Sequence, residues 1–348
     1  MKIAERPFGF ADGGECTLYT LTNAGGASFS VTDYGASLVS LLVPDKNGEL
    51  TDVVLGFDSA EEYESGTNYF GAVIGRYANR ISNAGFTLNG EKYTLAVNNS
   101  GGHTLHGGIK NYAFKRWNAE LKDNGILFSL LSPDGDEGFP GNLTVTAEYT
   151  WTDDNILTLT YTGISDADTV CNITNHSYFN LAGHTGESAA KQLLMLNADY
   201  YTPADENLIP TGEVLSVANT PFDFRIPKQI EKDIGEDNIQ LHNGGGYDMN
   251  FVLNKTERGK LESFGTLMSI TSGIRMDVAT TQPACQIYSD NGDTPRKGKG
   301  GAVYGKHAGI AVETQHFPDS IAKTFFPTPI LKAGEKYEEV TIFAFGLL

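Results

Sequence analysis

Alternation of apolar and polar residues with a period of two recurs along this chain and most constrains how it can fold. From Leu157 to Thr162, Leu and Tyr alternate with Thr, and from 143 to 148 apolar residues alternate with Thr and Glu. A period of two is typical of half-buried strands, whereas helical periodicity is confined to short pieces such as the acidic turn at 59–62. The sequence therefore predicts an all-β, antiparallel fold with few short helices.

Turn signals separate the predicted strands. The segment Ala27–Val43 is rich in apolar and β-branched residues and stops at Pro44, before an Asp-Lys-Asn-Gly turn at 45–48, which predicts a hairpin. Asn-Gly pairs mark further turns at 89–90, 124–125 and 291–292. The chain has neither a repeat of 40 to 50 residues nor a Ser/Gly/Pro linker. We therefore expect one domain, residues 1–348.

The charge balance narrows the class of partner. Acidic residues outnumber basic ones by 43 to 25, which gives a formal net charge of −18, and the chain has no Lys/Arg-rich run. Nucleic acid binding needs a basic surface. The same charge disfavours anionic membranes and highly phosphorylated substrates. A neutral small molecule is the expected partner.

The expected compartment and oligomeric state rest on apolar segments and on cysteine spacing. The start, MKIAERPFGF, has no apolar run typical of a signal peptide, and no stretch approaches the roughly 20 apolar residues that span a bilayer. Three cysteines without CxxC spacing favour neither a disulfide framework nor a zinc site. We expect a reduced, cytoplasmic protein that is a monomer or a weak homodimer.

Two histidines stand in polar, turn-like segments: His106 in HTLHGG and His176 in NHSYFNL. Around His176, Asn175, Ser177, Tyr178 and neighbouring Asn180 supply donors and acceptors within six residues. Buried polar groups must find partners. The segment is therefore either a self-satisfied polar network or a ligand site, and the residues alone leave both open.

Three further sets of residues have either a functional or a structural interpretation. Glu313 follows the apolar run 309–312 and is expected to end a buried strand, as a desolvated general base or as an ion-paired structural residue. Arg76 and Arg80 lie four apart in GRYANRIS, where Arg80 suits hydroxyl recognition and Arg76 is expected to pair a carboxylate. His103-x-x-His106 with Glu313 could imitate a metal-binding facial triad.

Several motifs in one order carry a family resemblance. TDYGASLVSLLVPDKNGELTDVVLGFDS, GRYANRIS, LHGG, NHSYFNL, GYDMNF, TTQPACQIY and ETQHFPDS follow one another along essentially the whole chain. In this order they resemble the aldose 1-epimerase (galactose mutarotase) family. The resemblance implies a large antiparallel β-sandwich, a supersandwich of the galactose mutarotase-like type, and an enzyme that needs no metal or organic cofactor.

The resemblance also implies roles for individual residues. His176 corresponds to the acid that protonates the sugar ring oxygen, and Glu313 to the base that removes the anomeric hydroxyl proton. The positions that correspond to substrate binding are Asn79, Arg80, His106, Asp248 and Gln286, with Ser177 and Tyr178 flanking the acid. We expect nearby carboxylates to keep His176 protonated while Glu313 is ionised.

The chain departs from the family pattern at one place and leaves two rival functions. Met249 follows Asp248 where the family usually has His, which puts a neighbouring contact in doubt. The expected reaction is interconversion of the α and β anomers of neutral aldohexoses such as galactose and glucose. The rivals are a hexose-6-phosphate 1-epimerase and a non-catalytic sugar-binding or regulatory protein of the same fold.

Overall fold

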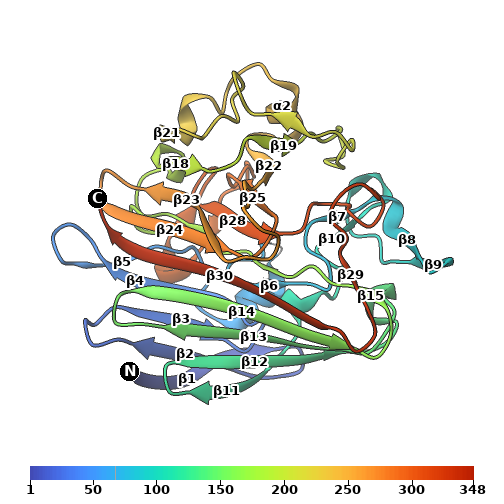
Figure 1. Ribbon diagram of the computed structural model, residues 1–348. Helices are drawn as coiled ribbons and strands as arrows, with labels where there is room; N and C mark the ends of the chain where they lie inside the picture. Colours follow the sequence, from blue (N-terminus) through green and yellow to red (C-terminus); the bar gives the residue numbers. More distant parts are fainter. Residues whose placement is uncertain (67) are drawn as a thin grey trace.

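The computed structural model describes residues 1–66 and 68–348, and its strands form three main antiparallel sheets (Figure 1). Within these residues the α-helices are short, α1 (Ala60–Ser65) and α2 (Ile239–Gly244). The all-β prediction is confirmed, and α1 lies where the acidic turn was expected. No helix among the described residues has the length and apolar character needed to cross a membrane.

The first sheet comes entirely from the amino-terminal part of the chain. Its strands, in spatial order, are β1 (Lys2–Ala11), β2 (Gly14–Thr22), β3 (Ser28–Thr32), β4 (Leu38–Pro44) and β5 (Leu50–Asp52). The predicted turn at 45–48 connects β4 to β5, whose residues Pro44 and Leu50 pair. The segment Ala27–Val43 is thus two strands with an interruption at 33–37.

The second sheet is the largest and contains the strands with the clearest alternation. Its spatial order is β11 (Asn118–Lys122), β12 (Gly125–Ser132), β13 (Leu143–Trp151), β14 (Ile156–Ser165), β30 (Lys336–Leu347), β24 (Ile274–Thr280), β23 (Glu262–Met268), β18 (Leu193–Leu196) and β21 (Lys228–Gln229). Along β13 every second residue is buried, as a strand with one core face requires.

The third sheet carries the candidate site residues Tyr178, Asp248, Gln286 and Glu313. Its order is β17 (Tyr178–Phe179), β28 (Ile310–Gln315), β25 (Ala284–Tyr288), β22 (Asp248–Val252), β19 (Tyr200–Thr202) and β20 (Leu215–Ser216). Short pairs complete the fold: β6 (Val73–Ile74) with β16 (Thr174–Asn175), β7 (Arg80–Ile81) with β10 (Thr104–Leu105), β8 (Gly85–Leu88) with β9 (Glu91–Thr94), β15 (Thr169–Val170) with β29 (Ile330–Leu331), and β26 (Arg296–Lys297) with β27 (Val303–Tyr304).

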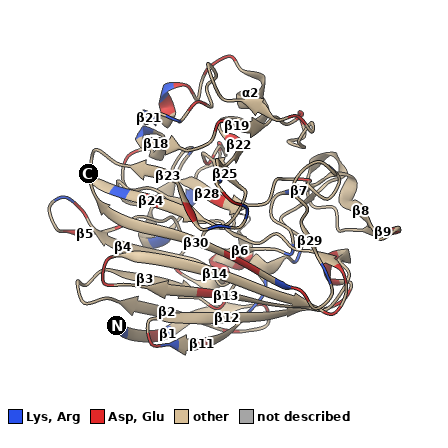
Figure 2. Ribbon diagram, viewed as in Figure 1, with Lys and Arg blue, Asp and Glu red and all other residues tan. Residues whose placement is uncertain are grey.

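One apolar core connects the three sheets. The Phe29 ring of β3 lies 6.2 Å from that of Tyr149 on β13, and the Phe179 ring of β17 lies 5.0 Å from that of Phe343 on β30. All four side chains belong to one continuous buried cluster. Lys and Arg residues are spread over the fold among the Asp and Glu residues (Figure 2). The three sheets therefore share one continuous apolar core.

Candidate active site

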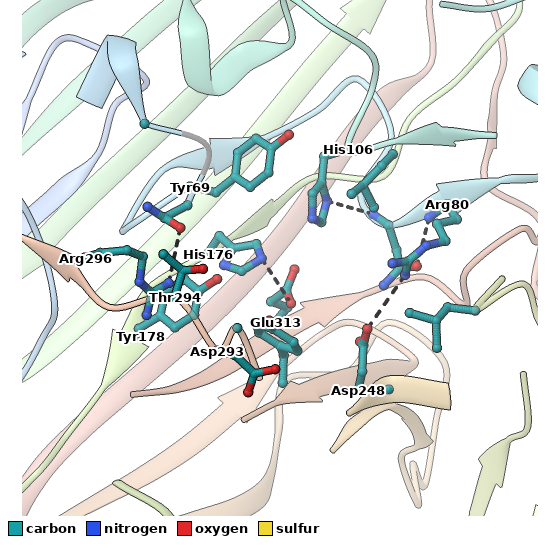
Figure 3. Close-up of a pocket in the computed structure, with 18 of the residues that line it drawn as sticks. Tyr69, Arg80, His106, His176, Tyr178, Asp248, Asp293, Thr294, Arg296 and Glu313 are labelled. Atoms are coloured by element: carbon teal, nitrogen blue, oxygen red, sulfur yellow. Dashed lines mark hydrogen bonds and ion pairs between the residues drawn. The ribbon is translucent and has the colours of Figure 1, made fainter. Parts of the chain in front are cut away.

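A cavity of about 650 Å³ opens beside the third sheet and collects most of the predicted site residues (Figure 3). Of those residues, the cavity is lined by Asn79, Arg80, His106, His176, Tyr178, Asp248 and Glu313. These residues come from β7, β17, β22, β28 and the loops at 75–79, 106–111 and 176–177. The fold therefore brings segments from most of the chain to one polar pocket.

His176 lies between the two short strands β16 and β17, at the strand end that the sequence indicated. Its backbone N–H donates to Ala72 O at 2.9 Å, and its carbonyl accepts from the N–H of Gly71 at 3.0 Å. The imidazole is buried, and Nε2 lies 3.5 Å from Oε1 of Glu313. Backbone bonds on both sides of the residue thus fix the ring against the carboxylate.

Glu313 lies within β28 and does not end it, contrary to expectation. The strand continues to Gln315, and each of its six residues is buried. In the register, Gln286 of β25 faces Glu313. Oε2 of Glu313 is buried and has no hydrogen-bond partner in the described part of the chain. A buried carboxylate oxygen without a partner is costly and is typical of a functional group.

Burial disfavours the charged form of both residues. It lowers the pKa of His176 to about 4, so the imidazole is neutral near pH 7. Burial also raises the pKa of Glu313 well above its usual range; the negative charge of Asp248 adds to this, and Arg80 opposes it. The expectation of a protonated His176 beside an ionised Glu313 is therefore wrong for the pocket itself, because desolvation outweighs their attraction.

Asp248 and Arg80 form the end of the pocket beyond Glu313. Oδ1 of Asp248 accepts from Nε2 of Gln286 at 2.5 Å, and Oδ2 lies 3.8 Å from the Arg80 guanidinium. Nε of Arg80 donates to Oδ1 of Asn99 at 3.1 Å. The two charged groups are thus held in place by neighbouring amides and can offer both donors and acceptors to hydroxyls.

His106 is fixed by two hydrogen bonds with the backbone of Asn79. The N–H of Asn79 donates to Nδ1 of His106 at 3.1 Å, and the N–H of His106 donates to the carbonyl of Asn79 at 2.9 Å. Burial, reinforced by His176 and Arg80, holds the pKa of His106 well below its usual range. Because Nδ1 accepts, the neutral ring carries its proton on Nε2 and can only donate there.

Two predicted binding residues lie behind the cavity wall. The hydroxyl of Ser177 donates to Oδ1 of Asn175, and Gln286 contacts the site through Asp248. Neither residue lines the cavity. Ser177 thus belongs to the self-satisfied polar network that the sequence left open, whereas Tyr178 and His176 of the same segment face the cavity.

The side chain of Met249, the one departure from the family pattern, points away from the cavity. Successive side chains of a strand point to opposite faces. Asp248 faces the cavity, whereas Met249 is buried in the main apolar core. The side chain after Asp248 therefore packs away from the pocket, and the doubt about a neighbouring site contact is removed.

Arg76 is structural, but its partners differ from the expected carboxylate. Its buried guanidinium donates to the carbonyl oxygens of Ser132, Pro140 and Gly141. Among the described residues it forms no ion pair with a carboxylate. Arg76 therefore stabilises the chain around Ser132 and Pro140 by donating hydrogen bonds to carbonyl oxygens there.

Sequence reasoning missed several side chains at the cavity wall. They include Tyr69, Tyr288, Thr294 and Arg296. The ring of Tyr69 lies 4.9 Å from that of His106 and 5.8 Å from that of His176. Tyr69 precedes the GRYANRIS motif, and Arg296 begins a stretch that reads only as a charged loop, so no local pattern marked either residue.

The ligand set for a metal ion is incomplete. His106, His176 and Glu313 have ligand atoms within 4.8 Å of one another. A metal at Nε2 of His106 needs the lone pair there, which places the proton on Nδ1, where the Asn79 N–H already donates. His103 has the same constraint, since its Nδ1 accepts from the N–H of Asn83 at 2.9 Å, and it does not line the cavity. These residues do not fit the facial triad.

Comparisons with known proteins agree with the fold. Residues 17–344 match the sequence profile of the aldose 1-epimerase family. A galactose mutarotase from Bos taurus is 42% identical over 318 residues, covering 91% of this chain and 90% of the relative, and an aldose 1-epimerase from Haemophilus influenzae is 40% identical, covering 99% of each. The crystal structure of a galactose 1-epimerase from Lactobacillus acidophilus superposes with a TM-score of 0.85 at 29% identity, covering 100% of this chain and 99% of the other.

Proposed function

The chain belongs to the aldose 1-epimerase family, and on that premise we propose that it is a mutarotase whose cavity interconverts the α and β anomers of neutral aldohexoses such as galactose and glucose. The observation that carries the assignment of the site is the buried contact of 3.5 Å between Nε2 of His176 and Oε1 of Glu313. The ring oxygen and the anomeric hydroxyl oxygen are attached to the same carbon, C1. The acid and the base that act on them must therefore lie side by side, as His176 and Glu313 do.

The reaction needs two proton transfers. Glu313 removes the proton of the anomeric hydroxyl, and His176 gives a proton to the ring oxygen; the bond from C1 to the ring oxygen breaks while the carbonyl forms. Rotation about C1–C2 then presents the other face of the carbonyl. The reverse transfers close the ring with the opposite configuration, so the residues return to their starting protonation.

The pair holds one shared proton throughout this cycle. With the closed sugar the proton lies on His176, and after ring opening Glu313 carries a proton and His176 is neutral. Burial favours this second, uncharged arrangement, because it lowers the pKa of His176 and raises that of Glu313. Polar contacts to the closed sugar must offset that preference, which brings the two arrangements closer in free energy and lowers the barrier between them.

The other lining residues supply binding contacts. The Nε2–H of His106 is a fixed donor, the Arg80 guanidinium donates, and the Asp248 carboxylate accepts. Hydroxyls of a neutral sugar can satisfy all three. Tyr178, whose ring lies 5.0 Å from that of His176, adds an apolar face and a hydroxyl.

A hexose 6-phosphate fits this pocket less well. Both guanidinium groups at the cavity wall are neutralised by carboxylates, since Arg80 lies 3.8 Å from Asp248 and Arg296 lies 2.5 Å from Asp290. Glu313 and Asp293 line the same cavity. A dianionic phosphate would meet no unpaired cation among these groups.

Assembly and location complete the proposal. We infer a monomer or weak homodimer in the cytoplasm that works without nucleic acid, membrane or cofactor. Cys16, Cys171 and Cys285 are all buried and unpaired, which suits a reducing compartment. Light scattering of purified protein tests the oligomeric state.

Polarimetry on freshly dissolved α-galactose and α-glucose tests the function. We expect Glu313→Gln and His176→Asn each to lower kcat by roughly 10²–10⁴-fold. Matched controls are Glu339→Gln and His316→Asn, because Glu339 also has a raised pKa and His316 has a pKa of about 4, yet neither lines this cavity. Catalytic variants that keep the wild-type rate would overturn the assignment.

A further inference from the structure

Arg296 occupies the end of the cavity opposite Arg80. It begins β26 and lines the same cavity as the catalytic pair. In Figure 3, His176 and Glu313 lie between Arg296 and Thr294 on one side and Asp248 and Arg80 on the other. The pocket therefore extends in two directions from the catalytic pair. The end at Asp248 and Arg80 has a proposed role in binding the sugar, and the end at Arg296 and Thr294 has none.

The guanidinium of Arg296 is held rigidly. NH1 donates to Oδ1 of Asn68 at 3.1 Å, and NH2 donates to Oδ2 of Asp290 at 2.5 Å. The group also lies over the ring of Phe70, with CZ 5.2 Å from the ring centroid. Its side chain is 18% exposed, whereas that of Asp290 is 1% exposed. A cation fixed on three sides and open to the cavity is a preorganised donor.

Packing contacts place this group on the His176 side of the pair. The Phe70 ring, over which the Arg296 guanidinium lies, is 5.0 Å from the ring of Tyr178, and the Tyr178 ring is 5.0 Å from that of His176. Arg80 lies instead beside Asp248, at the other end of the cavity (Figure 3). Arg296 thus lies on the acid side of the pair, and Arg80 on the base side.

The connectivity of a pyranose then orients the sugar. In the proposed reaction the ring oxygen, which is bonded only to C1 and C5, lies at His176, and the anomeric hydroxyl on C1 lies at Glu313. C2 and C3 lie beyond C1, towards Asp248 and Arg80. C5 lies on the other side of the ring oxygen, and in a hexose it carries the exocyclic C6 group.

We propose that Arg296, together with the hydroxyl of Thr294, forms the subsite for the C6 hydroxymethyl group and favours aldohexoses over aldopentoses. This inference rests on the proposed function. Because Asp290 neutralises Arg296, the subsite offers hydrogen-bond donors without net positive charge and suits a hydroxyl. A site built to bond a hydroxyl rejects an analogue that lacks it, since its polar groups are then left unpaired.

Three sugars that share one ring test the proposal. L-Arabinose has the ring configuration of D-galactose without C6, and D-fucose has a methyl group in place of the hydroxymethyl. We expect the ratio of kcat/KM for D-galactose over L-arabinose to fall about tenfold in Arg296→Lys. The preference for D-galactose over D-fucose should fall with it, because the hydroxyl is the group recognised.

Control variants separate the possible outcomes. Arg296→Lys keeps a cation for the buried Asp290, and Thr294→Val tests the subsite without disturbing that pair. Arg80→Lys should lower activity on D-galactose and L-arabinose together, and Arg275→Ala, at an exposed ion pair, should leave the ratio as in wild type.

Unchanged ratios in both Arg296→Lys and Thr294→Val would overturn the subsite, as would a ratio that responds to Arg80→Lys instead. Wild-type protein inactive on all three sugars would contradict the proposed function and not the subsite alone.

Discussion

Asn79 and His106 exchange two hydrogen bonds, one of which joins the Asn79 N–H to Nδ1 of the His106 ring at 3.1 Å. A backbone N–H can only donate, so Nδ1 must accept and the ring proton must lie on Nε2. Burial keeps the ring neutral by holding its pKa well below the usual range. The backbone thereby sets both the charge and the tautomer of a residue at the cavity wall.

We expect nitrogen-15 NMR to find His106 as the neutral Nε2–H tautomer at pH 7. For the same reason Zn²⁺ at a concentration equal to that of the protein should leave the mutarotation rate unchanged, because metal binding at Nε2 would break the bond from Asn79. Inhibition by Zn²⁺ that His106→Asn removes would contradict this prediction.

The pH dependence of kcat/KM should report the charges around Glu313. Its alkaline limb is the loss of the one proton that His176 and Glu313 share, and in the empty pocket burial places this proton on Glu313. Because Asp248 raises the pKa of Glu313 and Arg80 lowers it, Asp248→Asn should move the alkaline limb to lower pH and Arg80→Gln should move it to higher pH. Both variants will also lower the rate, but the position of a limb is independent of its height. Shifts in the same direction would show that the limb belongs to another group.

The sequence predicted the strands better than it predicted the site. In β13 and β14 one face is core and the other is not, so the alternation from Leu143 to Ser165 is visible in the residues. Glu313 was expected at a strand end because polar residues follow an apolar run there. In β28 both faces are covered, so Thr314 and Gln315 are buried strand residues as well.

Tertiary contacts explain what local patterns could not indicate. Arg296 reaches the cavity because Asn68 and Asp290 hold it, and Arg76 is satisfied by loop carbonyls such as that of Pro140 instead of by a carboxylate. Asn68 lies 228 residues from Arg296 and Pro140 lies 64 residues from Arg76, and carbonyl groups are present in every residue. The family resemblance supplied the pairing of His176 with Glu313, which no spacing rule contains.

Replacing Met249 by His should lower stability without improving catalysis. Met249 is 2% exposed within the main apolar core, on the strand face opposite Asp248. An imidazole there must lose its hydration without an assured partner, which costs about 1–3 kcal/mol. Urea denaturation should show this loss, while KM for galactose should remain within about twofold of wild type. A marked fall in KM would indicate that the side chain reaches the substrate.

Acid should destabilise the protein because buried histidines resist protonation in the folded state. The effect can be measured at His316, which does not line the cavity of the catalytic pair. Burial lowers the pKa of His316 from about 6.5 to about 4. The folded state therefore favours the neutral ring, so the stabilising contribution is complete above pH 6.5 and is lost progressively as the pH falls from about 6.5 to about 4. The loss amounts to about 3 kcal/mol between pH 7 and pH 4.

Urea denaturation at pH 7 and pH 4 should therefore show that wild type loses about 3 kcal/mol more than His316→Asn over this interval. His176 has the same lowered pKa and is present in both proteins, so its contribution cancels in the comparison. An equal loss in the two proteins would mean that His316 titrates normally in the folded state, and that water reaches its ring.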